Sequence, residues 1–115
     1  MDNNTLENTV YRTLSPDRVL DAVENLGQSC NGRILALNSY ENRVYQVGIE
    51  DETPVIVKYY RPGRWSNASI LEEHAFALEL AAEELPVVAP LQTGTTTLHT
   101  FQGFRFTKPA QAAKY

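Results

Sequence analysis

The sequence predicts an α+β fold in which a five-stranded antiparallel sheet carries one long helix, with a shorter helix before the first strand. Three observations support this prediction. Apolar segments of strand length recur between turn residues, and one segment after residue 66 is long enough for a helix of several turns. The first three strand segments are joined by connections too short for a crossover helix. The chain has 115 residues, 43% of them hydrophobic, so it can form one domain with a modest core.

The first helix is predicted after a polar N-terminal arm of residues 1–12. Ser15 is a favourable N-cap, and Pro16 loses no needed hydrogen bond at the first helical position. Gly27 supplies the C-terminal stop. We expect the apolar stripe of this helix to pack in the core; it is formed by Val19, Leu20, Val23 and Leu26.

Three strands are predicted next, at Gly32–Leu37, Arg43–Ile49 and Val55–Tyr60, with a turn over residues 51–54 between the last two. Side chains alternate between the two faces of a strand. The third strand therefore directs one set of side chains to one face, Val55, Val57 and Tyr59, and a second set to the other, Ile56, Lys58 and Tyr60.

The long helix is predicted to run from the N-cap Ser66 to about Glu84, because Pro86 ends it. Trp65 and Ile70 have the spacing of a hydrophobic staple at its start. Two further short strands are predicted from Leu91–Thr93 and Leu98–Phe106, with turns at Gly94 and at Gln102–Gly103.

This order of elements is the layout of the amino-terminal lobe of a kinase, in which a helix lies between the third and fourth strands of an antiparallel sheet. Phosphoryl transfer requires that the phosphates of the nucleotide are gripped and their charge is balanced. On such a lobe a loop between the first two strands, a lysine on the third strand and a glutamate on the helix do this work. Lys58 has the position of that lysine, although a strand lysine can equally extend to water at a strand end.

The long helix offers Glu72, Glu73 and Glu79 as partners for Lys58. Glu73 shares a helix face with Phe76 and Leu80, and we expect that face to dock on the sheet and bring the Glu73 carboxylate towards Lys58. Glu73 is therefore the first choice and Glu72 the reserve. The alternative is that both belong to a solvated acidic first turn, which the helix dipole favours.

The loop Asn38–Asn42 departs from the glycine-rich pattern of protein kinases, although its hydroxyl, amide and backbone N–H groups can bind phosphate oxygens. Its alternative role is that of a plain connection. His74 and His99 lack the spacing of metal ligands, and we expect no metal site and a surface or boundary position for His74.

Composition excludes several classes of protein. The net charge of −4 does not fit a nucleic-acid binder, and no apolar run approaches the roughly 20 residues that cross a bilayer. The N-terminus has no secretory signal pattern, and the single Cys30 fits a reducing compartment. We therefore expect a cytoplasmic protein with neither a nucleic-acid nor a membrane partner.

Several motifs closely resemble the bacterial stress response kinase A family, over about residues 13–106. They are Leu-Asn-Ser-Tyr-Glu-Asn-Arg-Val-Tyr-Gln at 37–46, Lys-Tyr-Tyr-Arg-Pro at 58–62 with Arg64 and Trp65, Ile-Leu-Glu-Glu-His at 70–74 with Phe-Ala-Leu at 76–78, and Pro86-Val87 with Ala89-Pro90. That family has the aminoglycoside phosphotransferase (choline kinase-like) fold. The resemblance implies an ATP-dependent serine/threonine protein kinase of the bacterial cytoplasm, whose substrate is a protein hydroxyl.

The resemblance also implies roles for single residues. Ser39 contacts the ATP phosphates, Lys58 is the phosphate-binding lysine, and a glutamate of the Glu72–Glu73 pair is its partner. The adenine pocket would be lined by Leu37, Val44 and Ile56.

The chain departs from the family after residue 106. Residues 107–115 do not look like the family's hinge strand, and the helical lobe that carries the catalytic aspartate and the magnesium ligands is not in the sequence. We therefore expect an arm (1–12), an ATP-binding lobe (13–106) and a divergent tail (107–115), with weak nucleotide binding and no phosphate transfer by the chain alone. Two alternatives stay open: a lobe of a small-molecule phosphotransferase of the same fold, and a non-catalytic module that self-associates through its exposed cleft face.

Overall fold

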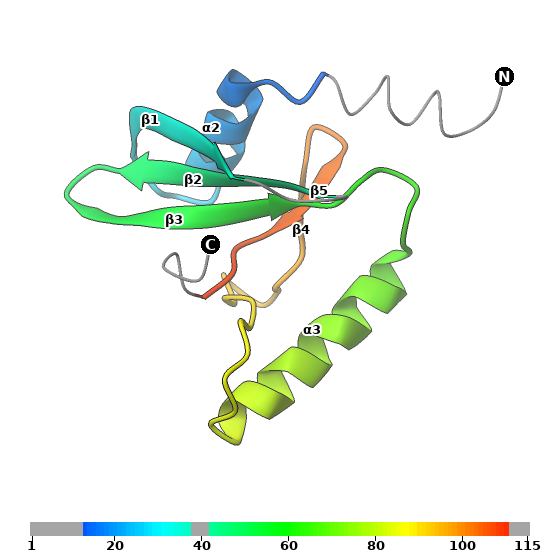
Figure 1. Ribbon diagram of the computed structural model, residues 1–115. Helices are drawn as coiled ribbons and strands as arrows, with labels where there is room; N and C mark the ends of the chain where they lie inside the picture. Colours follow the sequence, from blue (N-terminus) through cyan, green and yellow to red (C-terminus); the bar gives the residue numbers. More distant parts are fainter. Residues whose placement is uncertain (1–12, 38–41, 111–115) are drawn as a thin grey trace, which may run out of the picture.

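The computed structural model describes residues 13–37 and 42–110, in which the chain forms two helices and five strands (Figure 1). The predicted arm, residues 38–41 with Ser39, and residues 111–115 lie outside the described residues. In chain order the elements are α2 (Pro16–Asn25), β1 (Cys30–Leu37), β2 (Arg43–Ile49), β3 (Glu52–Tyr59), α3 (Asn67–Ala82), β4 (His99–Phe101) and β5 (Phe104–Thr107).

The strands form one antiparallel sheet in the order β1-β2-β3-β5-β4, with α3 between β3 and β4 in the sequence. The predicted α+β class and the five-stranded antiparallel sheet with one inserted helix are therefore confirmed. No described helix is both long and apolar enough to cross a membrane.

Helix α2 covers one face of the sheet and closes the core. Its N-cap is Ser15, whose Oγ accepts a hydrogen bond from the N–H of Arg18 (3.3 Å), and Gly27 follows its end with a φ of 98°. These features match the predicted start and stop. The core joins the stripe of α2 to apolar side chains of the sheet, among them Val19, Val23, Val47, Val57, Tyr59 and Phe106. Because Val57 and Tyr59 face α2, Ile56 and Lys58 face the opposite side, as the alternation predicts.

Strand β3 begins at Glu52, three residues earlier than predicted, because the turn before it is tighter. Asp51 has a φ of 58°, and Glu52 already pairs with Ile49 on β2. The predicted strand at Leu91–Thr93 is wrong, since Thr93 makes only an isolated bridge with Thr96 around the Gly94 turn. The segment 98–106 is divided by its Gln-Gly turn into β4 and β5.

Residues 107–110, at the start of the predicted tail, pack against the segment that follows α3. Thr107 ends β5, and Lys108 and Pro109 are buried. The N–H of Leu91 donates to the carbonyl of Lys108 (2.7 Å), and the N–H of Ala110 donates to the carbonyl of Ala89 (2.8 Å). The sequence does not predict this pairing, because the segment after α3 is not a regular strand and shows no strand-like alternation of polar and apolar residues.

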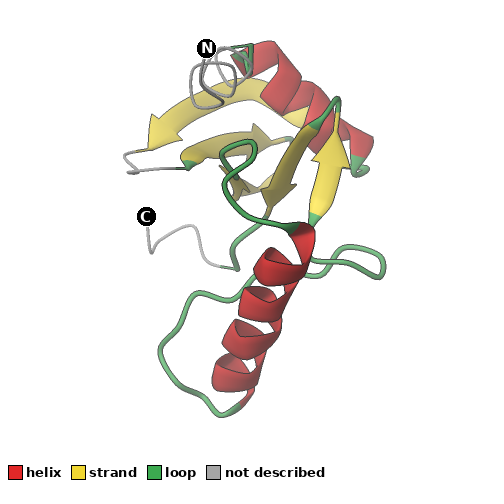
Figure 2. Cartoon of the chain, turned by 90° about the vertical axis from the view of Figure 1, so that its right-hand side faces the viewer, coloured by secondary structure: helices red, strands yellow, loops and turns green. Residues whose placement is uncertain are grey.

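Helix α3 extends away from the sheet, as two perpendicular views show (Figures 1 and 2). Ser66 caps it as predicted, accepting a hydrogen bond at Oγ from the N–H of Ser69 (3.1 Å). The face predicted to dock was wrong, because Phe76 is 60% exposed. The buried residues of α3 are Ile70 and His74, four positions apart on one stripe, so Glu73 lies at the flank of the docking face and not at its centre.

Candidate functional site

One row of side chains crosses four strands on the sheet face opposite α2. In the sheet register Leu37 pairs with Val44, Val44 with Lys58, and Lys58 with Thr107. Directly paired residues of antiparallel strands share a face, so these four side chains lie side by side. Ile56 lies on the same face, two residues before Lys58. The register thus brings together four residues that the sequence analysis selected: Leu37, Val44, Ile56 and Lys58.

Lys58 is a half-buried cation that has no carboxylate partner in the described part of the chain. Its Nζ lies 5.4 Å from the centroid of the Tyr60 ring, a cation–π contact on the same face. Within residues 13–37 and 42–110 no acidic side chain forms an ion pair with it. A strand lysine packed along its stem and unpaired at its ammonium is available to bind an anion.

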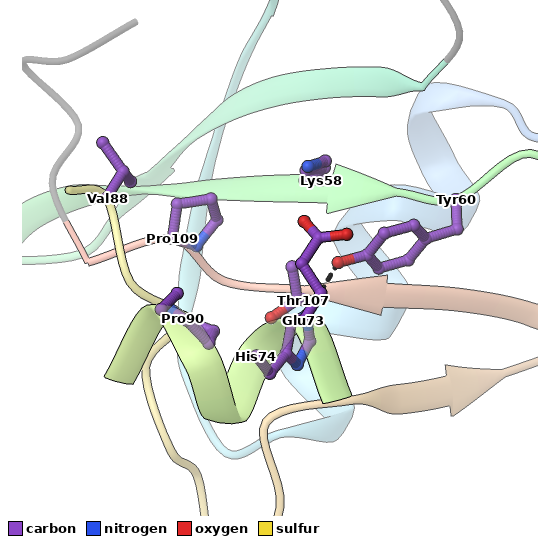
Figure 3. A pocket seen from close by; sticks show the side chains of 9 residues that line it. Lys58, Tyr60, Glu73, His74, Val88, Pro90, Thr107 and Pro109 are labelled. Carbon is purple, nitrogen blue, oxygen red and sulfur yellow. Dashed lines mark hydrogen bonds between the residues drawn. The ribbon is translucent and has the colours of Figure 1, made fainter. Parts of the chain in front are cut away.

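Glu73 reaches the site from α3 and lines the same pocket as Lys58 (Figure 3). This pocket, lined also by Val88, Pro90 and Pro109, has a cavity volume of about 50 Å³, so it has room for a few waters and not for a nucleotide. Glu72 does not line it; that side chain borders a shallow groove on the outer side of α3. Of the two candidate glutamates, Glu73 thus shares this pocket with Lys58 and Glu72 does not.

A second and larger hollow opens beside Lys58, towards the start of α3. Its volume is about 230 Å³, and its lining combines apolar walls with the polar groups of Asn42, Lys58, Ser69 and Glu73. The Oδ1 of Asn42 accepts a hydrogen bond from the N–H of Arg61 (3.4 Å), which leaves the amide Nδ2 to donate. An ammonium, an amide and a hydroxyl beside a helix N-terminus form a donor set that fits a phosphate group.

A buried polar network lies behind the pocket and was not foreseen. His74 is 5% exposed, contrary to the predicted surface or boundary position. Its Nε2 is hydrogen-bonded to the Tyr60 hydroxyl (2.7 Å) and its Nδ1 to the Oγ1 of Thr97 (2.7 Å). Thr107, which pairs with Lys58 in the sheet, donates from its Oγ1 to the carbonyl of Thr97 (2.6 Å).

Burial lowers the pKa of His74 below 6.5; nearby Glu73 raises this pKa, and Lys58 and His99 lower it. The ring is therefore neutral at neutral pH, with one nitrogen donating and the other accepting. One sequence signal could have located His74, because it lies four residues after Ile70, the member of the hydrophobic staple that belongs to the helix.

The remaining predicted residues are placed as follows. Leu37 is half-buried at the end of β1, and Ser39 lies outside the described residues. Val44 and Ile56 are 3% and 1% exposed, so a ligand reaches their side chains only when covering atoms move. Within the described part of the chain no three His, Cys, Asp or Glu side chains gather as metal ligands, so no fit for magnesium is found there.

Comparison with known proteins identifies the family. Residues 33–112 match the phosphotransferase enzyme family. The chain is 48% identical over 96 residues to stress response kinase A of Escherichia coli O157:H7 and to the protein of the same name from Escherichia coli strain K12. It is 47% identical over 96 residues to the serine/threonine protein kinase RdoA of Salmonella typhimurium strain LT2.

Each alignment covers 84% of this chain and 29% of the relative, so the chain spans less than a third of the length of the relatives that it matches. The resemblance inferred from the motifs is confirmed, and the chain belongs to the phosphotransferase enzyme family.

Proposed function

We propose that this chain is the ATP-binding lobe of a serine/threonine protein kinase of the stress response kinase A type. The observation that carries the proposal concerns the ammonium of Lys58, which has no carboxylate partner among residues 13–37 and 42–110. It lies beside a hollow that is lined by phosphate-binding groups and by Glu73. Phosphoryl transfer depends mainly on positioning and charge stabilisation, and these are the groups it requires on this lobe.

Each side chain then has a defined task. Lys58 binds a phosphate as a point charge, and Asn42 and Ser69 supply further donors from either side. Ser39 belongs to the same loop as Asn42, and we assign it a phosphate contact as well. We assign to Glu73, which lines the same pocket, the task of pairing with Lys58 and orienting it when nucleotide binds. ATP, when bound, supplies the phosphoryl group that is transferred.

We assign the adenine base to the apolar row of Leu37, Val44 and Ile56, next to Lys58 on the sheet. Because Val44 and Ile56 are buried, base binding must displace the atoms that cover them, and that displacement weakens the affinity. Nucleotide affinity of the chain is therefore expected to be low, and to come chiefly from the phosphate end.

The name of the Salmonella relative, a serine/threonine protein kinase, favours a protein hydroxyl over a small molecule as the acceptor. We assign the magnesium ligands, the catalytic aspartate and the acceptor groove to the part of the relatives' length that this chain does not span. We also place the reaction in the cytoplasm, where the single thiol of Cys30 stays reduced.

Calorimetric titration of the chain with Mg·ATP, ADP and adenosine tests the proposal. We expect measurable binding of ATP, weaker binding of ADP and the weakest binding of adenosine, because Lys58 contacts phosphate. Lys58→Met should weaken ATP binding by roughly tenfold or more, the loss expected for a charge-assisted contact of about 1.5–3 kcal/mol.

Lys108→Met is the matched control, because it removes the same charge from a buried lysine whose Nζ contacts Gln28 (3.4 Å) and not the pocket. Equal ATP affinity in Lys58→Met and the unmodified chain, or equal affinity of the unmodified chain for ATP and adenosine, would overturn the assignment.

A further inference from the structure

Helix α3 buries few of its side chains against the rest of the molecule. It extends away from the sheet (Figure 2), and of its sixteen residues, all of them described, only Ile70 and His74 are buried. At its first turn the Oδ1 of Asn67 accepts a hydrogen bond from Nη1 of Arg105 on β5 (2.9 Å). Ile70 contributes apolar packing, which does not fix a direction, whereas the two hydrogen bonds of His74 do.

His74 directly follows Glu73, so the orientation of its ring determines where Glu73 points. Consecutive residues of an α-helix are about 100° apart around the axis and about 1.5 Å apart along it. A slip of α3 by one residue would thus turn Glu73 away from the pocket that it shares with Lys58.

Both hydrogen-bond partners of His74 are linked to residues beside Lys58. Tyr60 carries the ring that lies 5.4 Å from the Lys58 ammonium, and Figure 3 shows the hydroxyl of that ring bonded to His74. Thr97 is bonded to Thr107, the residue opposite Lys58 in the sheet. The His74 ring therefore connects α3 directly to Tyr60 and, through Thr97, to Thr107, the residue that pairs with Lys58.

We propose that His74 is a positioning residue: its ring, held between Tyr60 and Thr97, fixes the rotation of α3 so that Glu73 faces Lys58. The role of the Lys58–Glu73 pair rests on the proposed function, whereas the position of the helix does not. If His74 contributed only stability, its loss would loosen the whole fold without moving Glu73.

Carbodiimide crosslinking measures this position without any nucleotide, because it joins a carboxylate to an amine that comes within reach. In the unmodified chain we expect a Lys58–Glu73 amide, mapped by proteolysis and mass spectrometry, and no Lys58–Glu72 amide. His74→Phe, which keeps an aromatic ring and removes both hydrogen bonds, should lower the yield of the Lys58–Glu73 amide several-fold. Tyr60→Phe, which removes one bond from the other side and keeps the ring beside Lys58, should lower it as well.

Ile70→Val is the matched control, because it removes one methylene from the other buried residue of α3 and leaves the His74 bonds intact. It costs stability in the same range as a lost hydrogen bond, but should leave the crosslinking yield unchanged. A yield in His74→Phe equal to that in the unmodified chain, or an equal loss in Ile70→Val and His74→Phe, would overturn the proposal.

A second measurement reports the position of α3 relative to the sheet. Spin labels at Thr53→Cys on β3 and Ala82→Cys at the end of α3, both exposed, report the distance between helix and sheet in a Cys30→Ser background. We expect a narrow distance distribution that broadens or shifts in His74→Phe and is unchanged in Ile70→Val. If the unmodified chain fails to bind ATP but the distribution shifts in His74→Phe, the proposed function is refuted and the role of His74 is not. If the distribution is unchanged in His74→Phe, the role of His74 is refuted whatever the ATP affinity.

Discussion

The Tyr60 hydroxyl and Nε2 of His74 lie 2.7 Å apart in a buried position, and this contact joins the end of β3 to the middle of α3. The two residues are only fourteen positions apart, but one follows the strand that carries Lys58 and the other follows Glu73. A single hydrogen bond thus spans the two elements whose relative position determines whether the lysine and the glutamate meet.

Tyr60→Phe is expected to lower the free energy of unfolding by about 1–3 kcal/mol, because it leaves a buried imidazole nitrogen without a partner. Urea denaturation followed by circular dichroism measures this change. Tyr45→Phe is the control, since Tyr45 is half-buried and its hydroxyl makes no hydrogen bond within the described residues; its midpoint should stay close to that of the unmodified chain. Equal urea midpoints for both variants would show that the Tyr60–His74 hydrogen bond does not stabilise the fold.

The sequence predicted the sheet and the position of Lys58 because both depend on local patterns. Alternation over Val55–Tyr60 determines which face Lys58 occupies, and the short connection before β3 fixes its pairing with β2. The caps Ser15 and Ser66 are likewise local signals, since each acts on an N–H three residues later.

The buried network could not be predicted in the same way, because its members are contributed by four separate segments. His74 meets Thr97 twenty-three residues later in the chain, and Thr97 meets Thr107 through a backbone carbonyl that has no sequence signature. The predicted docking face of α3 was wrong for a related reason. The spacing of Glu73, Phe76 and Leu80 suggested one shared face, whereas the buried residues of the helix are Ile70 and His74. Contacts between residues far apart in the sequence determine both the buried network and the docking face of α3. Helical spacing alone cannot show which of two overlapping stripes of α3 is buried.

Gly48→Ala is expected to destabilise the fold by less than about 1 kcal/mol, because a Cβ at this position would displace the end of the exposed Asn31 side chain. The Oδ1 of Asn31 accepts a hydrogen bond from the N–H of Arg33 (3.0 Å), at the point where the register between β1 and β2 shifts. The new methyl group would displace that amide and break the bond. Asn31→Ala removes the same bond, so adding Gly48→Ala to that variant should cost little more, and thermal unfolding of the single and double variants measures this. A full further loss in the double variant would locate the collision elsewhere.

The sequence analysis expected the chain to self-associate through its cleft face. From the exposed apolar side chains of the structure we predict instead that α3 forms the contact. The cleft-face residues Val44 and Ile56 are buried, whereas Leu71, Phe76 and Leu78 of α3 are exposed, Phe76 by 60%. Sedimentation velocity at increasing concentration should show a dimerising chain that Phe76→Ser returns towards the monomer. Leu37→Ser, at the half-buried edge of the cleft face, is the comparison. If Leu37→Ser abolished association and Phe76→Ser did not, the cleft face would be the contact after all.

The two histidines are expected to make the fold less stable in mild acid. Burial lowers the pKa of both His74 and His99 below 6.5, with Lys58 and Lys108 adding to this effect and Glu73 opposing it at His74. As the pH falls through 6.5, the unfolded chain therefore takes up protons that the folded chain does not. The free energy of unfolding is largest above this pH and decreases as the pH falls from 6.5 towards the lower pKa values of the folded state.

His99→Phe separates this effect from the titration of carboxylates. The buried Nε2 of His99 has no hydrogen-bond partner among the residues that the structure describes. Its ring packs on Phe106 with centroids 5.3 Å apart, so a phenyl ring can take its place. Urea midpoints measured between about pH 7.5 and pH 5.5 should fall less steeply in this variant than in the unmodified chain, because one of the two groups no longer takes up a proton on unfolding. An identical pH dependence in both proteins would mean that His99 titrates alike in the folded and unfolded chain.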